Sequence, residues 1–243
     1  MSVENRVRSF VKSLSWRAIA FCVLFTTTLV LGGSKELAFW TALCYNVVQI
    51  AIYFFHERTW ANIKWGTSKG LFIQMTGMSG AGKTTLARMV GQRLEKKGHL
   101  VEVIDGDEFR SGLCSDLGFS KEDRNTNIRR LGFVSKVLAR NRVISIISAI
   151  NPYDDVRQEL SNLGPNVKVV YIKCSLDELK ERDTKGLYRK ALLPDDHPEK
   201  IHNFTGISDP FDVPNDADLV IDTEDESIDA SAAKLEKFIL RNI

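Results

Sequence analysis

The sequence predicts an α/β fold with a doubly wound parallel sheet, preceded by an N-terminal hairpin of two apolar α-helices. Three observations lead to this prediction. Two long runs without charge occupy residues 18–34 and 37–55. From residue 71 onward, short β-rich runs alternate with helical patterns, and a glycine-rich loop connects the first such run to the first such helix. We expect the hairpin to cover residues 1–66 and the α/β domain to cover residues 70–243.

The composition indicates a folded protein whose two parts have different surroundings. Of the 243 residues, 44% are apolar and 26% are charged, which is typical of a folded chain. Residues 1–70 carry a net charge of +5, whereas the remaining residues carry a net charge of −3. The four cysteines occur singly, a pattern typical of neither a disulfide framework nor a zinc site. We expect no nucleic-acid partner.

The two uncharged runs have the length of membrane spans. As helices they would extend about 26 and about 29 Å, close to the roughly 30 Å of the hydrocarbon core of a bilayer. Amphipathic rings lie near the expected interfaces, at Trp16, Trp40, Tyr53 and Trp60. We therefore predict an integral membrane hairpin with transmembrane helices at about residues 18–34 and 37–55.

The basic residues predict the orientation of this hairpin. They concentrate before the first run and after the second, at Arg6, Arg8, Lys12, Arg17, Arg58, Lys64 and Lys69. Both termini and the α/β domain should therefore face the cytoplasm at a bacterial inner membrane. A cleaved signal peptide is an alternative, disfavoured by LVLGG before Ser34 and by the second run. A soluble helical hairpin is another, although it should show more polar positions at helical spacing.

The α/β part contains five runs that read as buried parallel strands, at residues 71–75, 100–104, 143–150, 167–172 and 219–221. Helical patterns lie between and after them, at residues 83–97, 126–141, 154–163, 176–182 and 227–240. Ligands of such sheets bind beyond the carboxyl ends of the strands. The residues that directly follow each strand are therefore the candidates for function.

A complete phosphate-binding loop of the form G-x-x-x-x-G-K-[ST] follows the first predicted strand. It reads GMSGAGKTT over residues 77–85. Its glycines let successive backbone N–H groups converge on phosphate oxygens at the N-terminus of the next helix. Lys83 would reach the β- and γ-phosphates of ATP, and Thr84 would hold Mg²⁺. The expected nucleotide-binding residues are Gly77, Met78, Ser79, Gly80, Ala81, Gly82, Lys83, Thr84 and Thr85.

Two carboxylates follow the second predicted strand. Asp105 and Asp107 would lie at the sheet edge to which the first strand also delivers its loop. A carboxylate there can bind Mg²⁺ or orient an attacking hydroxyl. Because Asp-Gly is also a common turn, position alone leaves both readings open. Lys83, Asp105 and Asp107 are the expected catalytic residues, and Thr84 and Asp105 are the expected metal ligands.

Four segments resemble a known enzyme family. They are DGDEFRSGLCSDLGFSKEDRNTNIRR (residues 105–130), KGLY (185–188), NFTGISDPF (203–211) and LVIDT (219–223). In this order they closely resemble adenylylsulfate kinases (APS kinases), with a match over about residues 70–240. The resemblance implies that ATP and Mg²⁺ serve to phosphorylate the 3′-hydroxyl of adenosine 5′-phosphosulfate (APS). The product would be 3′-phosphoadenylyl sulfate, an intermediate of sulfate assimilation.

The resemblance also implies roles for individual residues. Guanidinium groups would hold the phosphosulfate, and the rings of Phe119 and Phe204 would sandwich the acceptor adenine. Arg182 and Lys185 would begin a lid that closes over ATP and excludes water. The expected acceptor-binding residues are Asp107, Arg110, Phe119, Arg124, Asn127, Ile150, Asn151 and Phe204.

The N-terminal part resembles a family of short bacterial membrane hairpins of unknown function. KSLSWRAIA (residues 12–20) and YFFHERTWANIKWG (residues 53–66) carry this resemblance. It implies a membrane location and nothing about chemistry.

Three residues near the acceptor depart from the kinase family's pattern. Asn151 stands where the family usually has a serine, often described as forming a phosphoserine, so transfer here would be direct and in line. Asp154 replaces an arginine, which should weaken anion binding unless Asp154 is paired or points away. His202 replaces a lysine, in a longer and more acidic lid segment. A related kinase with another acceptor and a nucleotide-sensing membrane regulator without turnover are therefore alternatives; a homodimer is compatible with the sequence.

Overall fold

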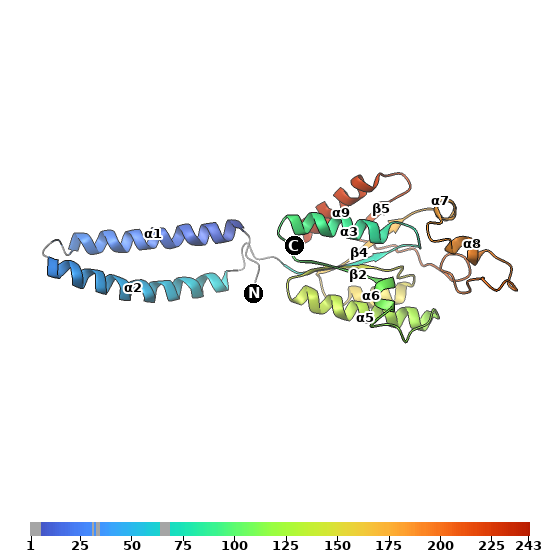
Figure 1. Ribbon diagram of the computed structural model, residues 1–243, viewed down its shortest axis with the longest axis horizontal. Coiled ribbons are helices and arrows are strands. Elements are labelled where there is room, and N and C mark those ends of the chain that lie inside the picture. The colour runs from blue at the N-terminus through green and yellow to red at the C-terminus, as the bar shows by residue number, and fades with distance from the viewer. Residues whose placement is uncertain (1–5, 31, 33–34, 64–68) are drawn as a thin grey trace. The chain divides into compact units, whose positions relative to one another are not determined.

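The structure is a computed structural model that describes residues 6–30, 32, 35–63 and 69–243. The chain divides into two compact units, Met1–Ser68 and Lys69–Ile243. Figure 1 shows paired helices in the first unit and a layered α/β arrangement in the second.

The first unit is a helical hairpin (Figure 1). Helices α1 (Arg6–Val30) and α2 (Lys35–Asn62) pack against each other. Lys12 of α1 forms an ion pair of 2.9 Å with Glu57 of α2. The ring of Trp16 contacts the ring of Tyr53 edge-on, with centroids 4.8 Å apart. These contacts fix how the two helices align.

Many large apolar side chains of this hairpin are exposed: Val7, Phe10, Leu14, Val30, Trp40, Val47, Val48, Ile50, Tyr53, Phe54, Phe55 and Ile63. Within the described part of the chain, no helix combines the length and the apolarity needed to cross a membrane. Two helices are present, but α1 begins at Arg6 rather than at residue 18, and α2 ends at Asn62 rather than at residue 55. The transmembrane spans at residues 18–34 and 37–55 remain a prediction. Residues 31, 33 and 34 of the first span lie outside the described residues.

The second unit contains a five-stranded parallel sheet with the strand order β2-β3-β1-β4-β5. Its strands are apolar along most of their length because helices cover both faces of the sheet. The predicted strands are confirmed, with ends that differ by one or two residues. They are β1 (Leu71–Thr76), β2 (Val101–Asp105), β3 (Ile144–Ser148), β4 (Val167–Lys173) and β5 (Leu219–Asp222).

Two pairs of helices cover the sheet, α3 and α9 on one face and α5 and α6 on the other (Figure 1). The first face buries a core that includes Ile73 and Leu235, and the second buries one that includes Phe72 and Leu131. Each such fully buried side chain contributes about 1.5–3 kcal/mol. These helices are α3 (Lys83–Lys96), α5 (Lys121–Arg140), α6 (Asp154–Ser161) and α9 (Ile228–Asn242).

The sequence-based prediction missed three helical segments near the carboxyl ends of the strands. These are α4 (Gly106–Arg110), α8 (Leu187–Ala191), which follows α7 (Leu176–Arg182), and residues 121–125 at the start of α5. Side-chain caps explain two of them. The carboxylate of Asp105 accepts the N–H groups of Asp107 and Glu108, and Ser120 Oγ accepts the N–H of Asp123. The predicted start of α5 at residue 126 is therefore wrong by five residues.

Candidate active site

The phosphate-binding loop lies between β1 and α3. Gly77, Gly80 and Gly82 adopt φ angles of 153°, 79° and 93°, a region that favours glycine. A Cβ on Gly77 would also lie 2.5 Å from the carbonyl oxygen of Ile172. The loop therefore needs glycine for its curvature, and it ends at the N-terminus of α3, where anions bind. Of the expected nucleotide-binding residues, Gly80 and Thr85 are exposed and the others are buried or half-buried.

Two side chains from distant segments hold this loop. Tyr188 of α8 donates its hydroxyl to the carbonyl oxygen of Ser79 at 2.8 Å. Thr223, directly after β5, donates its hydroxyl to the carbonyl oxygen of Ala81 at 3.1 Å. Helix α8, which lies in the predicted lid, and the residue after the last strand thus both support the conformation of the loop.

Lys83 is the first residue of α3 and is 8% exposed. Its ammonium donates to the carbonyl oxygens of Gly77 at 2.7 Å and Met78 at 2.8 Å. Burial lowers the pKa of Lys83 to about 7, although the negative charge of Asp107 opposes this effect. A phosphate anion at the loop would stabilise the charged form of this lysine.

Thr84 and Asp105 come together as expected. Thr84 Oγ1 donates to Asp105 Oδ2 at 2.9 Å and lies 2.9 Å from Ser148 Oγ, at the end of β3. Two hydroxyls and a carboxylate beside a phosphate-binding loop are hard oxygen donors of the kind that Mg²⁺ prefers. The residues present therefore fit the metal, and Ser148 is an addition to the predicted pair.

Gly106 and Asp107, which directly follow Asp105 in the chain, line a pocket of about 70 Å³. Seven of the eight expected acceptor-binding residues line it, and Phe204 does not. The lining residues are Gly106, Asp107, Arg110, Phe119, Arg124, Asn127, Ile128, Ala149, Ile150, Asn151 and Pro152.

The pocket carries two guanidinium groups around one aromatic ring. The guanidinium carbon of Arg110 lies 4.6 Å from the ring centroid of Phe119, and that of Arg124 lies 5.5 Å away. Burial, and then the charge of Arg124, lowers the pKa of Arg110. Arg124 Nε forms an ion pair of 3.8 Å with the carboxylate of Asp209. Two neighbouring cations in a partly enclosed pocket favour an anionic ligand.

The two phenylalanines predicted to sandwich a base lie in different surroundings. Phe119 is 60% exposed at the pocket, whereas Phe204 is 8% exposed. Phe204 packs edge-on against the ring of Tyr188, with centroids 5.0 Å apart. The sandwich by Phe119 and Phe204 stays a prediction.

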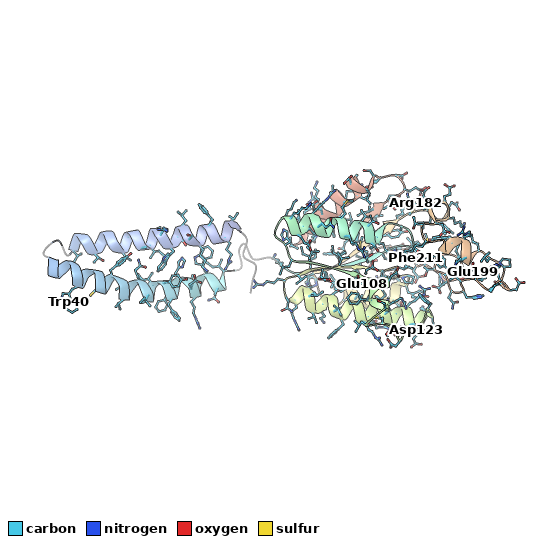
Figure 2. The ribbon with its side chains drawn as sticks, in the orientation of Figure 1. Trp40, Glu108, Asp123, Arg182, Glu199 and Phe211 are labelled. Carbon is cyan, nitrogen blue, oxygen red and sulfur yellow. The ribbon has the colours of Figure 1, made fainter. Side chains whose placement is uncertain are left out.

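The two expected lid residues contact different parts of the site. Lys185 Nζ forms an ion pair of 2.7 Å with Asp107, so it connects the lid to the acceptor pocket. Arg182, labelled at the end of α7 in Figure 2, donates to the carbonyl oxygen of Thr223 at 2.8 Å and pairs with Glu178 at 2.8 Å. Arg182 is therefore placed beside the segment that supports the phosphate-binding loop.

The three departures from the family pattern differ in their position. Asn151 is 1% exposed and lines the pocket. Asp154 does not line it; its carboxylate pairs with Arg157 at 3.1 Å and is half exposed. His202 is exposed and does not line the pocket either. The condition under which Asp154 would leave anion binding intact is therefore met.

Three residues of the site were not predicted. Ser148 could have been found, because it ends a strand at the edge where ligands bind. Gln74 is a polar residue in an apolar strand, which is a weak signal. Asp209 lies within the segment NFTGISDPF, which carries the family resemblance, but no role was predicted for it. It accepts the hydroxyl of Tyr153 at 2.9 Å, and burial followed by this contact raises the pKa of Tyr153 to about 12.

The loop, the buried lysine and the cationic pocket define the class of this protein: it is an enzyme, a P-loop kinase. The chain belongs to the adenylylsulphate kinase family, which matches residues 69–222. Residues 10–61 match a family described as predicted membrane proteins (DUF2061).

Individual relatives agree with this membership. The adenylyl-sulfate kinase of Rippkaea orientalis is 44% identical over 167 residues, which cover 69% of this chain and 90% of that protein. The probable bifunctional SAT/APS kinase 2 of Sorangium cellulosum is 46% identical over 166 residues, 68% of this chain and 28% of that longer protein. Among solved structures, the Mycobacterium tuberculosis APS kinase CysC in complex with AMPPNP and APS matches with a TM-score of 0.65 and 35% identity. The match covers 71% of this chain and 98% of that one.

Proposed function

We propose that the chain transfers the γ-phosphoryl group of ATP to the 3′-hydroxyl of APS and releases ADP and 3′-phosphoadenylyl sulfate. The observation that carries this proposal is a pocket lined by Asp107, Arg110 and Arg124. It adjoins the phosphate-binding loop, because the N–H of Gly77 donates to the carbonyl oxygen of the lining residue Ile150 at 3.1 Å. The bound APS of the Mycobacterium tuberculosis relative supports the same acceptor. The arginines would bind the phosphosulfate, and the loop would bind the triphosphate.

In the proposed reaction, the 3′-oxygen forms a bond to the γ-phosphorus while the bond from that phosphorus to the β,γ-bridging oxygen breaks. Mg²⁺, held by Thr84 and Asp105, would neutralise charge on the phosphates. Lys83 would stabilise the charge that the departing ADP gains. Asp107, whose carboxylate is exposed at the pocket, would accept the hydroxyl proton. Asn151 cannot carry a phosphoryl group, so the transfer is direct.

A radiolabel experiment tests this function. The full chain is incubated with γ-labelled ATP and APS, and the label is followed into 3′-phosphoadenylyl sulfate. The Lys83→Ala variant should lose on the order of 10²-fold or more in rate, because a charge-stabilising contact in the transition state is removed. APS with a 3′-deoxyribose is the control and should accept no label. If labelled product forms equally fast with Lys83→Ala, or if another acceptor is labelled in place of APS, the proposal is wrong.

We also propose that the N-terminal hairpin holds the kinase at a bacterial inner membrane, with the kinase unit and both termini in the cytoplasm. The match of residues 10–61 to a family of predicted membrane proteins supports this location. The exposed apolar side chains of α1 and α2 support it further, since soluble monomers rarely expose large contiguous apolar patches.

A further inference from the structure

Asn151 lies on the wall of the acceptor pocket in a left-handed backbone conformation, with φ of 46°. Asparagine is one of the few residues besides glycine that tolerate this conformation. Its carbonyl oxygen accepts two hydrogen bonds, from Thr76 Oγ1 at 2.9 Å and from Arg157 Nη1 at 2.9 Å. The backbone of this turn is therefore held from two sides, independently of the Asn151 side chain.

The side chain of Asn151 is held by Gln74, a fully buried residue in the central strand β1. Asn151 Nδ2 donates to Gln74 Oε1 at 3.1 Å. At its other end, Gln74 Nε2 donates to the carbonyl oxygen of Arg157 at 3.1 Å and to Ser161 Oγ at 2.9 Å. The two amides thus form a chain of hydrogen bonds from α6 to the pocket, which we call the amide relay.

The orientation of both amides in this relay follows from the carbonyl of Arg157, which lies at the end away from the pocket. A backbone carbonyl can only accept, so the amide of Gln74 must point its nitrogen toward Arg157 and its oxygen toward Asn151. The nitrogen of Asn151 must then face Gln74. The oxygen, Asn151 Oδ1, consequently faces away from the relay.

Asn151 Oδ1 is buried and has no hydrogen-bond partner among the described residues. A buried polar atom without a partner destabilises the folded chain, so native structures rarely retain one without a reason. Because Asn151 lines the pocket and is 1% exposed, a bound molecule with a donor group can supply the missing partner. The arginines of the same pocket have only donor groups, so they cannot accept a hydrogen bond from the ligand.

We propose that Asn151 Oδ1 accepts a hydrogen bond from an N–H or O–H group of the acceptor nucleotide, and that Gln74 is a positioning residue that keeps this oxygen turned toward the pocket. The inference rests on the proposed acceptor, APS. Asn151 then selects an acceptor with a donor at this point, in addition to the anion that the arginines select.

The first test measures APS binding by calorimetry in the presence of ADP, together with kcat and the KM of ATP. Asn151→Gly keeps the left-handed turn and removes the amide, so the Kd of APS should rise about tenfold. Gln74→Leu should weaken APS binding in the same direction, because the Asn151 amide loses its orientation. The KM of ATP should not change in either variant. Gln158→Leu is the control, since Gln158 lies on α6 but bonds Asp216 on the surface.

The double variant separates positioning from mere stability. If Gln74 acts through Asn151, then Gln74→Leu in the Asn151→Gly background should weaken APS binding no further. A purely structural role of Gln74 would give additive losses in APS binding and would raise the KM of ATP as well. Either of these results would overturn its assignment as a positioning residue.

Three analogues identify the donor on the ligand, because APS has donors at its 2′-hydroxyl, its 3′-hydroxyl and its 6-amino group. Each analogue lacks one of these groups, and the third carries unsubstituted purine in place of adenine. The analogue that lacks the relevant donor should bind the wild type more weakly than APS does, and it should bind Asn151→Gly as tightly as APS does. The proposal is wrong if Asn151→Gly binds APS as tightly as the wild type does, or if none of the three analogues loses more affinity for the wild type than for Asn151→Gly. APS binding without phosphoryl transfer would instead refute the proposed function and leave this inference standing.

Discussion

Tyr188 of α8 and Ser79 of the phosphate-binding loop are joined by a hydrogen bond of 2.8 Å from the phenolic hydroxyl to the backbone carbonyl. Burial raises the pKa of Tyr188, so the hydroxyl keeps its proton and remains a donor. The same ring packs edge-on against Phe204. Helix α8, the phosphate-binding loop and the segment around Phe204 therefore meet at one side chain.

Removing this hydroxyl should loosen the loop. Tyr188→Phe keeps the ring contact with Phe204 but leaves the Ser79 carbonyl without its donor, which costs about 1 kcal/mol. We expect a melting temperature lower by about 2–4 °C and a higher KM for ATP. Calorimetry and steady-state kinetics measure both. Tyr171→Phe, a buried tyrosine on β4 outside the lid, is the control and should leave the KM of ATP unchanged; an equal rise in both variants would contradict the proposed link.

The lowered pKa of Lys83 predicts that nucleotide binding takes up a proton. Its pKa of about 7 in the structure lies below the ordinary value of 10.5, and the phosphates of ADP should raise it again. At a pH between about 7 and the raised pKa, Lys83 of the ADP-bound chain is protonated, whereas Lys83 of the free chain is mostly not. Proton uptake should therefore appear above about pH 7, be absent below it, and make ADP affinity fall as the pH rises.

Titration calorimetry in buffers of different ionisation enthalpy measures this uptake. ADP is added at about pH 8.5 with a chelator present, so that no metal contributes to the proton balance. Lys83→Met is the matched variant, because it has a similar length and no titratable group. Proton uptake that persists in Lys83→Met belongs to another group and contradicts the prediction.

The sequence was sufficient to predict the sheet and the phosphate-binding loop. Each strand is a short, mostly apolar run, and the loop motif indicates which strand end carries the nucleotide. The start of α5 and helix α4 were missed because polar, turn-like sequence is made helical there by the side-chain caps of Ser120 and Asp105. Such caps act over three residues and leave only a weak pattern in the sequence.

The missed parts of the site depend on contacts between distant segments. Gln74 and Asn151 are 77 positions apart, and only the pairing of β1 with β3 brings them together. Phe204 was expected to stack on the adenine base of the acceptor. Its packing on Tyr188 instead depends on the path of the segment between α8 and Phe204. Most residues that line the pocket were therefore predictable, whereas contacts between distant segments, such as that of Gln74 with Asn151, were not.

Asp154 should contribute little to APS affinity, in contrast to what its charge alone suggests. Its carboxylate pairs with Arg157 and does not line the pocket. Asp154→Asn should leave the KM of APS unchanged. It should cost about 1 kcal/mol of stability, because Asp154 is half exposed and buried Arg157 keeps its hydrogen bonds to the carbonyl oxygens of Asn151 and Asp212. Asp154→Arg should destabilise the protein, because it places two cations together. A marked fall in the KM of APS in either variant would show that Asp154 repels the acceptor.

The hairpin should be dispensable for chemistry and necessary for membrane attachment. Residues 67–243 contain the whole match to the kinase family, so this fragment should remain in the supernatant with the kcat of the full chain. The full chain should sediment with membranes and resist carbonate extraction.

Val47→Lys provides the matched test, because Val47 is 62% exposed on α2 near the centre of the second predicted span. A lysine there costs about 2.5–3.5 kcal/mol in a bilayer and nothing comparable in water, so it should release full-length protein into the soluble fraction with its kinase activity intact. If the full chain stays soluble without detergent, or if Val47→Lys sediments as the wild type does, the exposed apolar face of the hairpin does not contact lipid.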